Sequence, residues 1–125
     1  MNAAGRAAPT AGWSTAAEHA LALLGLARRA GRLALGATAV QKMVSSGARP
    51  VIIMACDASA PQRRRWSRLQ PVRGIVGDLL TRGELAARLG RADLAVVAVA
   101  DKSFVRGLFE LGVVADPAAA GAVRS

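Results

Sequence analysis

The sequence predicts an α/β fold, a three-layer α/β/α sandwich around a four-stranded mixed sheet. Two apolar runs, at residues 51–56 and 94–100, are typical of strands that are covered on both faces. Segments with apolar residues at helical spacing alternate with these runs and with two shorter strand-like segments, which predicts helices on both sides of the sheet. The chain is 53% apolar but only 3% aromatic. Its core must therefore consist of small aliphatic side chains, which suit close packing of helices on a sheet.

The first predicted helix begins at a capping box formed by Thr15 and Glu18 and ends at Gly31. In a capping box the two side chains satisfy backbone N–H groups that the first helical turn leaves without acceptors. Gly31 follows two arginines, and glycine adopts the left-handed conformation that ends many helices at no steric cost.

Gly36 marks the turn from a short strand, Arg32 to Leu35, into a second helix, Thr38 to Ser46. The first amides of a helix have no intrahelical acceptor, so this turn is predicted to place unpaired N–H groups at the surface. We expect Lys42 and Arg32 to lie beside them, and amides together with cations make a site for phosphate. The alternative is an ordinary strand-to-helix turn, because glycine occurs at most such turns.

Further capping residues predict the remaining helices. The capping boxes are Ser59 with Gln62 and Thr81 with Glu84, and Asp101 or Ser103 caps the last helix. Gly90 ends the fourth helix. Residues 71–76 form a strand that Arg73 and Gly74 weaken, so we place it at an edge of the sheet.

The chain is predicted to form one domain at residues 14–112, with a disordered leader at 1–13 and a flexible tail at 113–125. Both ends are rich in Ala, Gly and Pro and have no periodic pattern. No stretch has the features of a secretory signal, and no apolar run is long enough to span a bilayer. We therefore expect a cytoplasmic protein.

The net charge of +9 comes mainly from arginine, which accounts for all but two of the 17 basic residues. Such a surface attracts polyanions, which leaves nucleic acid, an anionic membrane surface and an acidic protein partner open. Arginine binds phosphate in a bidentate way and stacks on bases, so its excess favours RNA or DNA. In the third helix, Arg63, Arg64, Arg65 and Arg68 form either a solvated face or an RNA-facing patch, and Trp66 either stacks on a base or packs on the core.

Catalytic and metal sites have little support in the sequence. Cys56 is the single cysteine, so an intramolecular disulfide is excluded, and it is predicted to be buried. Asp57 and Asp101 follow the two buried strands, so a metal-dependent enzyme that uses both is an alternative. Each Asp also precedes a helix that it can cap. Because no phosphate-binding loop and no nucleophile with a partner base occurs, we predict no catalysis, no metal and no cofactor.

Four segments occur in an order that resembles a known family. They are Leu23-Leu24-Gly25-Leu26-Ala27-Arg28-Arg29-Ala30-Gly31, Gly36 to Lys42, Ala55-Cys56-Asp57-Ala58-Ser59, and Ala98-Val99-Ala100-Asp101-Lys102-Ser103-Phe104. The chain resembles the ribosomal-protein family of kink-turn RNA binders, typified by the archaeal large-subunit protein L-seven-Ae, and in particular its bacterial YlxQ-like branch. The resemblance covers residues 20–111.

This resemblance implies two RNA-binding loops, one before the second helix and one before the last strand. By position, Gly36 matches the family's loop glycine and Lys42 its helix lysine. Arg82 matches a basic residue before the fourth helix, and residues 90–92 fall in the second RNA-facing loop.

The chain departs from the family at the residues that read the RNA bases. Thr38 and Ala39 stand where kink-turn binders carry an adjacent Asn and Glu that bind the sheared G·A pairs. Thr38 keeps one hydroxyl, whereas Ala39 has no polar group. Each lost base-edge contact costs on the order of 1–3 kcal/mol of discrimination. We therefore predict RNA binding with weaker or different sequence choice.

The sequence as a whole predicts a small, non-enzymatic, ribosomal-protein-like RNA-binding protein that contacts structured, kink-turn-like RNA. Its partner is RNA, with ribosomal RNA as one candidate, and neither a small-molecule substrate nor a membrane is expected. The alternative is a protein-interaction module of the translation machinery. The predicted RNA contacts are Arg32, Gly36, Ala37, Thr38, Gln41, Lys42, Arg82, Arg88, Gly90 and Arg91.

Overall fold

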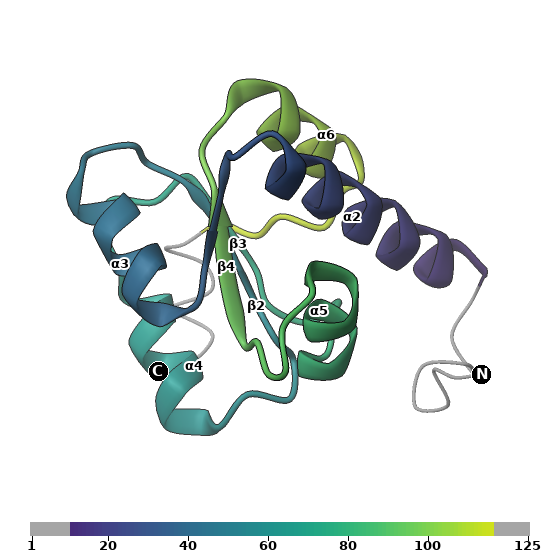
Figure 1. Ribbon diagram of the computed structural model, residues 1–125, viewed down its shortest axis with the longest axis horizontal. Helices are drawn as coiled ribbons and strands as arrows, with labels where there is room; N and C mark the ends of the chain where they lie inside the picture. Colours follow the sequence, from purple (N-terminus) through teal and green to yellow (C-terminus); the bar gives the residue numbers. More distant parts are fainter. Residues whose placement is uncertain (1–10, 117–125) are drawn as a thin grey trace.

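Helices and strands alternate along the chain in the computed structural model, which describes residues 11–116 (Figure 1). The elements are α2 (Ala11–Arg29), β1 (Leu33–Leu35), α3 (Ala37–Ser45), β2 (Val51–Met54), α4 (Ala60–Ser67), β3 (Gly74–Val76), α5 (Arg82–Leu89), β4 (Val96–Val99) and α6 (Lys102–Glu110). The predicted alternation of five helices with four strands is confirmed for these residues.

The four strands form one mixed sheet in the order β1-β4-β2-β3. Strand β4 is antiparallel to both of its neighbours, with Leu33 opposite Val99 on β1 and Met54 opposite Val96 on β2. Strands β2 and β3 are parallel. Strand β3 lies at an edge of the sheet, as predicted from Arg73 and Gly74.

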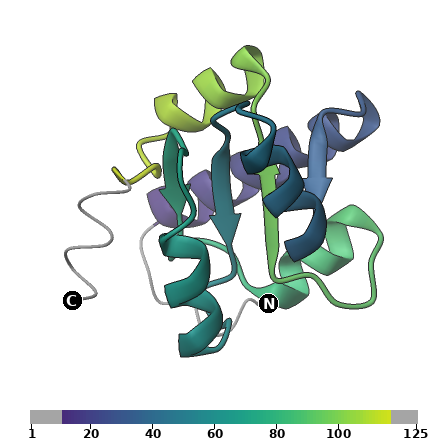
Figure 2. The same ribbon diagram turned by 90° about the vertical axis from the view of Figure 1, so that its left-hand side faces the viewer.

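Helices cover both faces of the sheet. Helices α3 and α4 pack on one face, and α2, α5 and α6 lie on the other (Figures 1 and 2). All four residues of β2 and of β4 are buried. Because these central strands contact helices on both sides, their sequences are continuously apolar, and the predicted α/β/α sandwich is confirmed.

The predicted caps start three of the helices. Ser59 with Gln62 starts α4, and Thr81 with Glu84 starts α5, in both cases with both hydrogen bonds of a capping box. The Asp101 carboxylate starts α6 by accepting the Ser103 N–H at 3.0 Å.

Helix α2 begins earlier than the sequence predicts. It already runs from Ala11, so Thr15 lies inside the helix and its capping box is not the start. Residues 11–13, which we assigned to the leader, are helical. No proline interrupts residues 11–15, and the single Gly12 costs a helix only about 1 kcal/mol. The rest of the predicted leader lies outside the described residues.

The segment after α6 is also more ordered than predicted. Val113 and Val114 are half-buried against the core, and Ala115 exchanges two hydrogen bonds with Ile75 of β3, at 3.0 and 2.7 Å. An edge strand presents unpaired N–H and C=O groups, and this segment satisfies some of them. The prediction of a flexible tail is therefore wrong for residues 113–115, and residues 117–125 lie outside the described part.

The burial and contacts of three side chains decide further predictions from the sequence. Trp66 is only 4% exposed, so it packs on the core instead of offering a face to a base. Arg63 is half-buried and donates to the carbonyl oxygens of Ala55 and Gly77 at 3.1 and 2.7 Å, so it holds the fold together. Cys56 lies in the turn after β2 and is exposed, so the prediction that it is buried is wrong. Among residues 11–116, no helix is both long and apolar enough to cross a membrane.

Replacing Gly74 by Ala should destabilise the protein. The added Cβ would overlap Val114 Cγ1 and lie 3.3 Å from the Ala115 carbonyl oxygen. Overpacking of this kind costs about 1–3 kcal/mol, measurable as a lower free energy of unfolding in urea. Gly83→Ala is the control, because a Cβ there meets nothing closer than Thr81 Oγ1 at 3.9 Å and helical Ala is favoured over Gly by up to about 1 kcal/mol. Equal stability of Gly74→Ala and the wild type would mean that residues 113–115 do not pack on β3.

Candidate nucleic-acid interface

The turn at Gly36 joins β1 to α3 and is held against β4. The Gly36 N–H donates to the Val96 carbonyl at 2.9 Å, and its own carbonyl accepts the Val40 N–H at 2.9 Å. Its backbone angles are φ 89° and ψ 164°. Only glycine adopts this region without strain. A Cβ there would meet no atom within 4 Å, so the need for glycine is conformational and the space above the turn is open.

The start of α3 presents backbone N–H groups to that open space. Gly36 has no side chain to cap the helix. Within the part of the chain that the structure describes, the amides of Ala37, Thr38 and Ala39 have no hydrogen-bond acceptor. Unpaired amides at a helix N-terminus bind phosphate oxygens well, because they also lie at the positive end of the helix dipole.

One face of α3 continues this surface. Thr38, Gln41, Lys42 and Ser45 are all exposed, at the spacing that places residues on one side of a helix. Val40 and Val44 face the core from the opposite side. The Lys42 side chain therefore follows Thr38 at a distance of one helical turn. The side-chain oxygen Oε1 of Gln41 also accepts a 3.4 Å hydrogen bond from Arg65 of α4.

The loop between α5 and β4 lies beside the Gly36 turn. Gly90 ends α5 in the left-handed conformation, with φ 71° and ψ 37°, and the Arg91 N–H then donates to the Ala86 carbonyl at 2.9 Å. Arg91 is exposed. The loop leads into Val96, the residue that binds the Gly36 N–H, so the two predicted RNA-binding loops meet at the lower end of the sheet in Figure 1.

Arg82 lies at the start of the fourth predicted helix, α5, and forms an ion pair with a carboxylate. Its Nε and Nη2 bind the two carboxylate oxygens of Asp93 at 3.1 and 2.7 Å, and its backbone N–H donates to Asp57 at 2.9 Å. The Arg82 hydrogen bond lowers the pKa of Asp93, and the same bond raises the pKa of Arg82. Arg82 therefore joins the start of α5 to the loop before β4, and its charge is already paired.

Arg32 lies at the other end of β1 from Gly36, contrary to our expectation. The strand separates their backbones by roughly 13 Å at the usual rise per residue. Arg32 instead lies near Asp101, with Nε 3.9 Å from the carboxylate. Its backbone N–H donates to the Ala27 carbonyl at 2.8 Å, which ends α2. The sequence places Arg32 only four residues from Gly36, but an extended strand turns that short separation into a long distance.

The alternative metal site at Asp57 and Asp101 is excluded by the direction of the strands. These residues follow β2 and β4, which are antiparallel, so they lie at opposite ends of the sheet. Asp101 caps α6 as predicted, whereas Ser59 caps α4 and Asp57 binds the first N–H of α5. No three His, Cys, Asp or Glu side chains of residues 11–116 form a metal-binding group.

Arg88 does not lie on the Gly36 turn but faces α2. The Arg88 Cδ lies 3.7 Å from the position that a Cβ of Gly25 would occupy. Together with Arg28 and Arg29 at the end of α2, it lines a hollow between the two helices. Arg28 and Arg29 are not among the predicted RNA contacts, although both lie in the first segment of the family resemblance.

Comparison with known proteins identifies a similar solved structure. No protein-family model and no curated protein matches the chain. The structure of a protein of unknown function from Bacillus halodurans is 32% identical in sequence, with a TM-score of 0.61. The match covers 74% of this chain and 94% of the Bacillus halodurans chain.

Replacing Asp93 by Asn should reduce the acid sensitivity of the fold. The pKa of Asp93 is lowered in the folded protein, so its ion pair contributes stability above its ordinary pKa of about 3.9 and loses it as the pH falls further. The wild type should be the more stable protein at pH 7, and its advantage over the variant should shrink below about pH 4. Both groups are exposed, so the difference is small.

Urea unfolding at a series of pH values measures this difference. Arg82→Gln is the matching variant, because it removes the same ion pair from the other side and should reduce the acid-dependent difference as well. If the wild type were more stable than Asp93→Asn by the same amount at every pH from 7 to 2.5, the ion pair would not have this role.

Proposed function

We propose that this chain, which belongs to the same family as the Bacillus halodurans protein, is a small non-enzymatic protein that binds structured, kink-turn-like RNA. The binding site is a surface made of residues 36–38, Gln41, Lys42, Gly90 and Arg91, which we call the Gly36 surface. The observation that carries the proposal is the hydrogen bond from Gly36 N–H to the Val96 carbonyl. It supports a single site, because it brings two loops more than fifty residues apart in the sequence to one end of the sheet.

The chemistry of the Gly36 surface suits an RNA backbone. Open amides at the start of α3 and the exposed cations Lys42 and Arg91 are donors for phosphate oxygens. The Arg82 and Asp93 pair holds the second loop in position and removes a carboxylate charge that would otherwise repel phosphate. The net charge of +9 attracts RNA to the molecule as a whole.

Base recognition at this surface is limited to short polar contacts. Thr38 contributes an exposed hydroxyl, and Ala39 contributes none. Recognition of RNA shape through phosphates and sugars therefore outweighs the reading of base edges. A bent internal loop offers closely spaced phosphates to a compact site, which is why kink-turn-like RNA is the favoured ligand. We infer that the protein works in the cytoplasm on ribosomal or other structured RNA.

Binding to a kink-turn RNA and to a plain duplex of equal length, from low to physiological salt, tests the proposal. The kink-turn RNA should bind more tightly at physiological salt, because its bend allows the amides and both cations to contact phosphates together. Lys42→Ala and Arg91→Ala should each weaken binding and lower the slope of log K against log salt concentration by about 1. Both residues are exposed, so the melting temperature should not change.

Arg106→Ala is the matched control, since it removes one exposed charge from α6, which starts at the end of the sheet opposite the Gly36 turn. It should leave the slope nearly unchanged. Equal effects of all three variants would indicate attraction by net charge alone and would refute a defined site. Absence of RNA binding at any salt concentration would favour the alternative of a protein-interaction module.

A further inference from the structure

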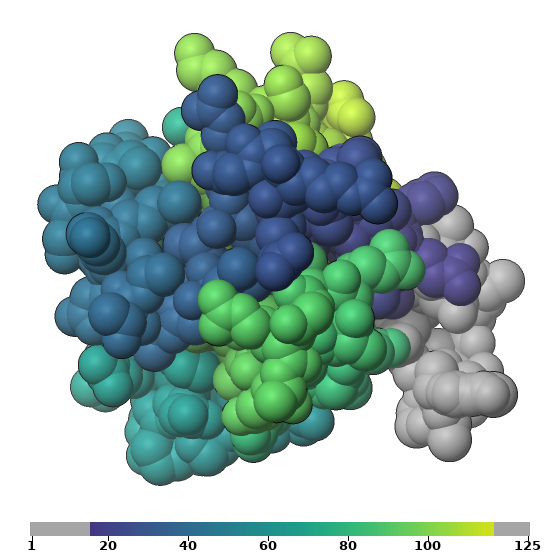
Figure 3. All heavy atoms as spheres, viewed as in Figure 1, coloured from purple at the N-terminus to yellow at the C-terminus, as the bar shows by residue number. Residues whose placement is uncertain are grey.

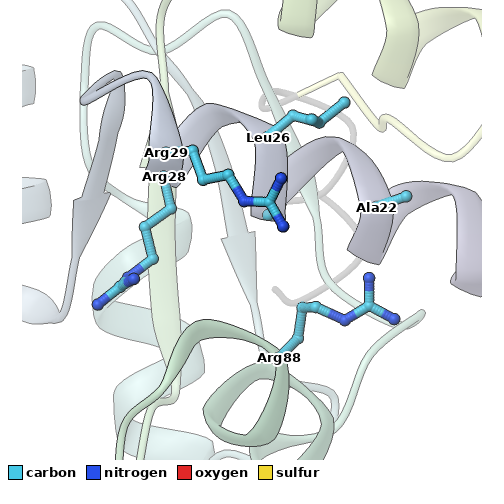
Figure 4. A pocket seen from close by; sticks show the side chains of 6 residues that line it. Ala22, Leu26, Arg28, Arg29 and Arg88 are labelled. Atoms are coloured by element: carbon cyan, nitrogen blue, oxygen red, sulfur yellow. The ribbon is translucent and has the colours of Figure 1, made fainter.

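Helices α2 and α5 lie side by side on the surface in Figure 3. A hollow of about 350 Å³ lies between them (Figure 4). Its lining consists of Ala22, Gly25, Leu26, Arg28, Arg29 and Arg88. Arg29 and Arg88 extend from the two helices into the space between them, as Figure 4 shows. The lining of the hollow thus combines apolar residues of α2 with arginines of both helices, which we call the cationic rim.

The cationic rim has no counter-charge in the described part of the chain. Arg28, Arg29 and Arg88 are all exposed, and no carboxylate of residues 11–116 forms an ion pair with any of them. All three lie in the last turn of their helices, where the helix dipole favours positive charge. The dipole explains why each arginine is tolerated at its own helix end, but it does not relieve their mutual repulsion across the hollow.

Leu26 is a second feature that the fold itself does not explain. It is 52% exposed beside these arginines, although most large apolar side chains of the described residues are buried. A ligand that carries both negative charge and apolar surface would cover Leu26 and neutralise the rim. A sugar–phosphate backbone has both, because each phosphate is joined to the carbon skeleton of a ribose.

The hollow is continuous with the Gly36 surface. The Arg28 Nη2 atom lies 3.8 Å from the position that a Cβ of Gly90 would occupy. Arg28 therefore extends from the end of α2 to the loop that holds Arg91. A polyanion that leaves the Gly36 surface past this loop would meet Arg28 first and the hollow next.

We propose that the hollow between α2 and α5 is a second RNA-backbone site, which binds the helical flank of the RNA held at the Gly36 surface. The arginines bind consecutive phosphates, and Leu26 packs against ribose. This inference rests on the proposed function, because it gives the same bound RNA a longer footprint. It also gives a role to Arg88, which faces α2 and lines the hollow.

Two RNAs distinguish binding at the hollow from binding at the Gly36 surface. One is a kink-turn RNA trimmed close to the kink, and the other is the same RNA with both helices lengthened. The double variant Arg29→Ala/Arg88→Ala should bind the lengthened RNA at least about tenfold more weakly than the wild type. The slope of log K against log salt concentration should fall by about 1.5 to 2, as expected for two lost phosphate contacts. Binding of the trimmed RNA should change by less than about twofold.

The matched control is Arg64→Ala/Arg68→Ala, which removes the same charge from exposed positions in the last turn of α4 and at its C-cap, on the opposite face of the sheet. This control should change the affinity for the trimmed RNA and for the lengthened RNA by the same factor. Unchanged binding of the lengthened RNA by the Arg29/Arg88 variant would overturn the proposal, and so would an equal loss in the control.

The two proposals fail in distinguishable ways. If the Arg29/Arg88 variant loses affinity while Lys42→Ala and Arg91→Ala do not, the Gly36 surface is refuted and the hollow stands as an RNA-backbone site. If the Lys42 and Arg91 variants alone lose affinity, the Gly36 surface stands and the hollow is refuted. If the wild type binds neither RNA, both are refuted.

Discussion

The antiparallel pairing of β4 with β1 and β2 is the constraint on which the rest of the structure depends. It makes β4 a buried central strand and joins Gly36 to Val96 by a 2.9 Å hydrogen bond. It also decides which loops share an end of the sheet. The turn before α3 and the loop before β4 meet at one end, whereas Asp101 and Arg32 lie at the other. A parallel β4 would have reversed this arrangement and brought Asp57 and Asp101 together.

The basic residues fall into two physical classes despite their equal contribution to the net charge. Arg63 and Arg82 are bound by carbonyl or carboxylate oxygens of the protein, so they stabilise the fold and position a loop. Arg28, Arg29 and Arg88 have no such partner among residues 11–116 and remain available to an external anion. In the proposed RNA complex, these three arginines supply the positive charge that lines the hollow between α2 and α5.

Local interactions explain why most of the fold could be predicted. The capping boxes at Ser59 and Thr81 and the left-handed Gly90 depend on residues within four positions of one another. Two of the fold predictions that were wrong concern residues 113–115 and Cys56. Residues 113–115 are ordered because β3 offers them an edge, and Cys56 is exposed in the turn after β2. Neither fact leaves a periodic pattern in the sequence.

The sequence by itself determined the order and type of the elements and the glycine at the α3 turn. These features follow from side-chain periodicity and from backbone conformations that only certain residues adopt. Only the tertiary structure decided that Arg82 is paired with Asp93, that Arg32 is far from Gly36 and that Arg88 faces α2. The physical reason is that strand direction and helix packing set distances between side chains, and separation along the chain does not.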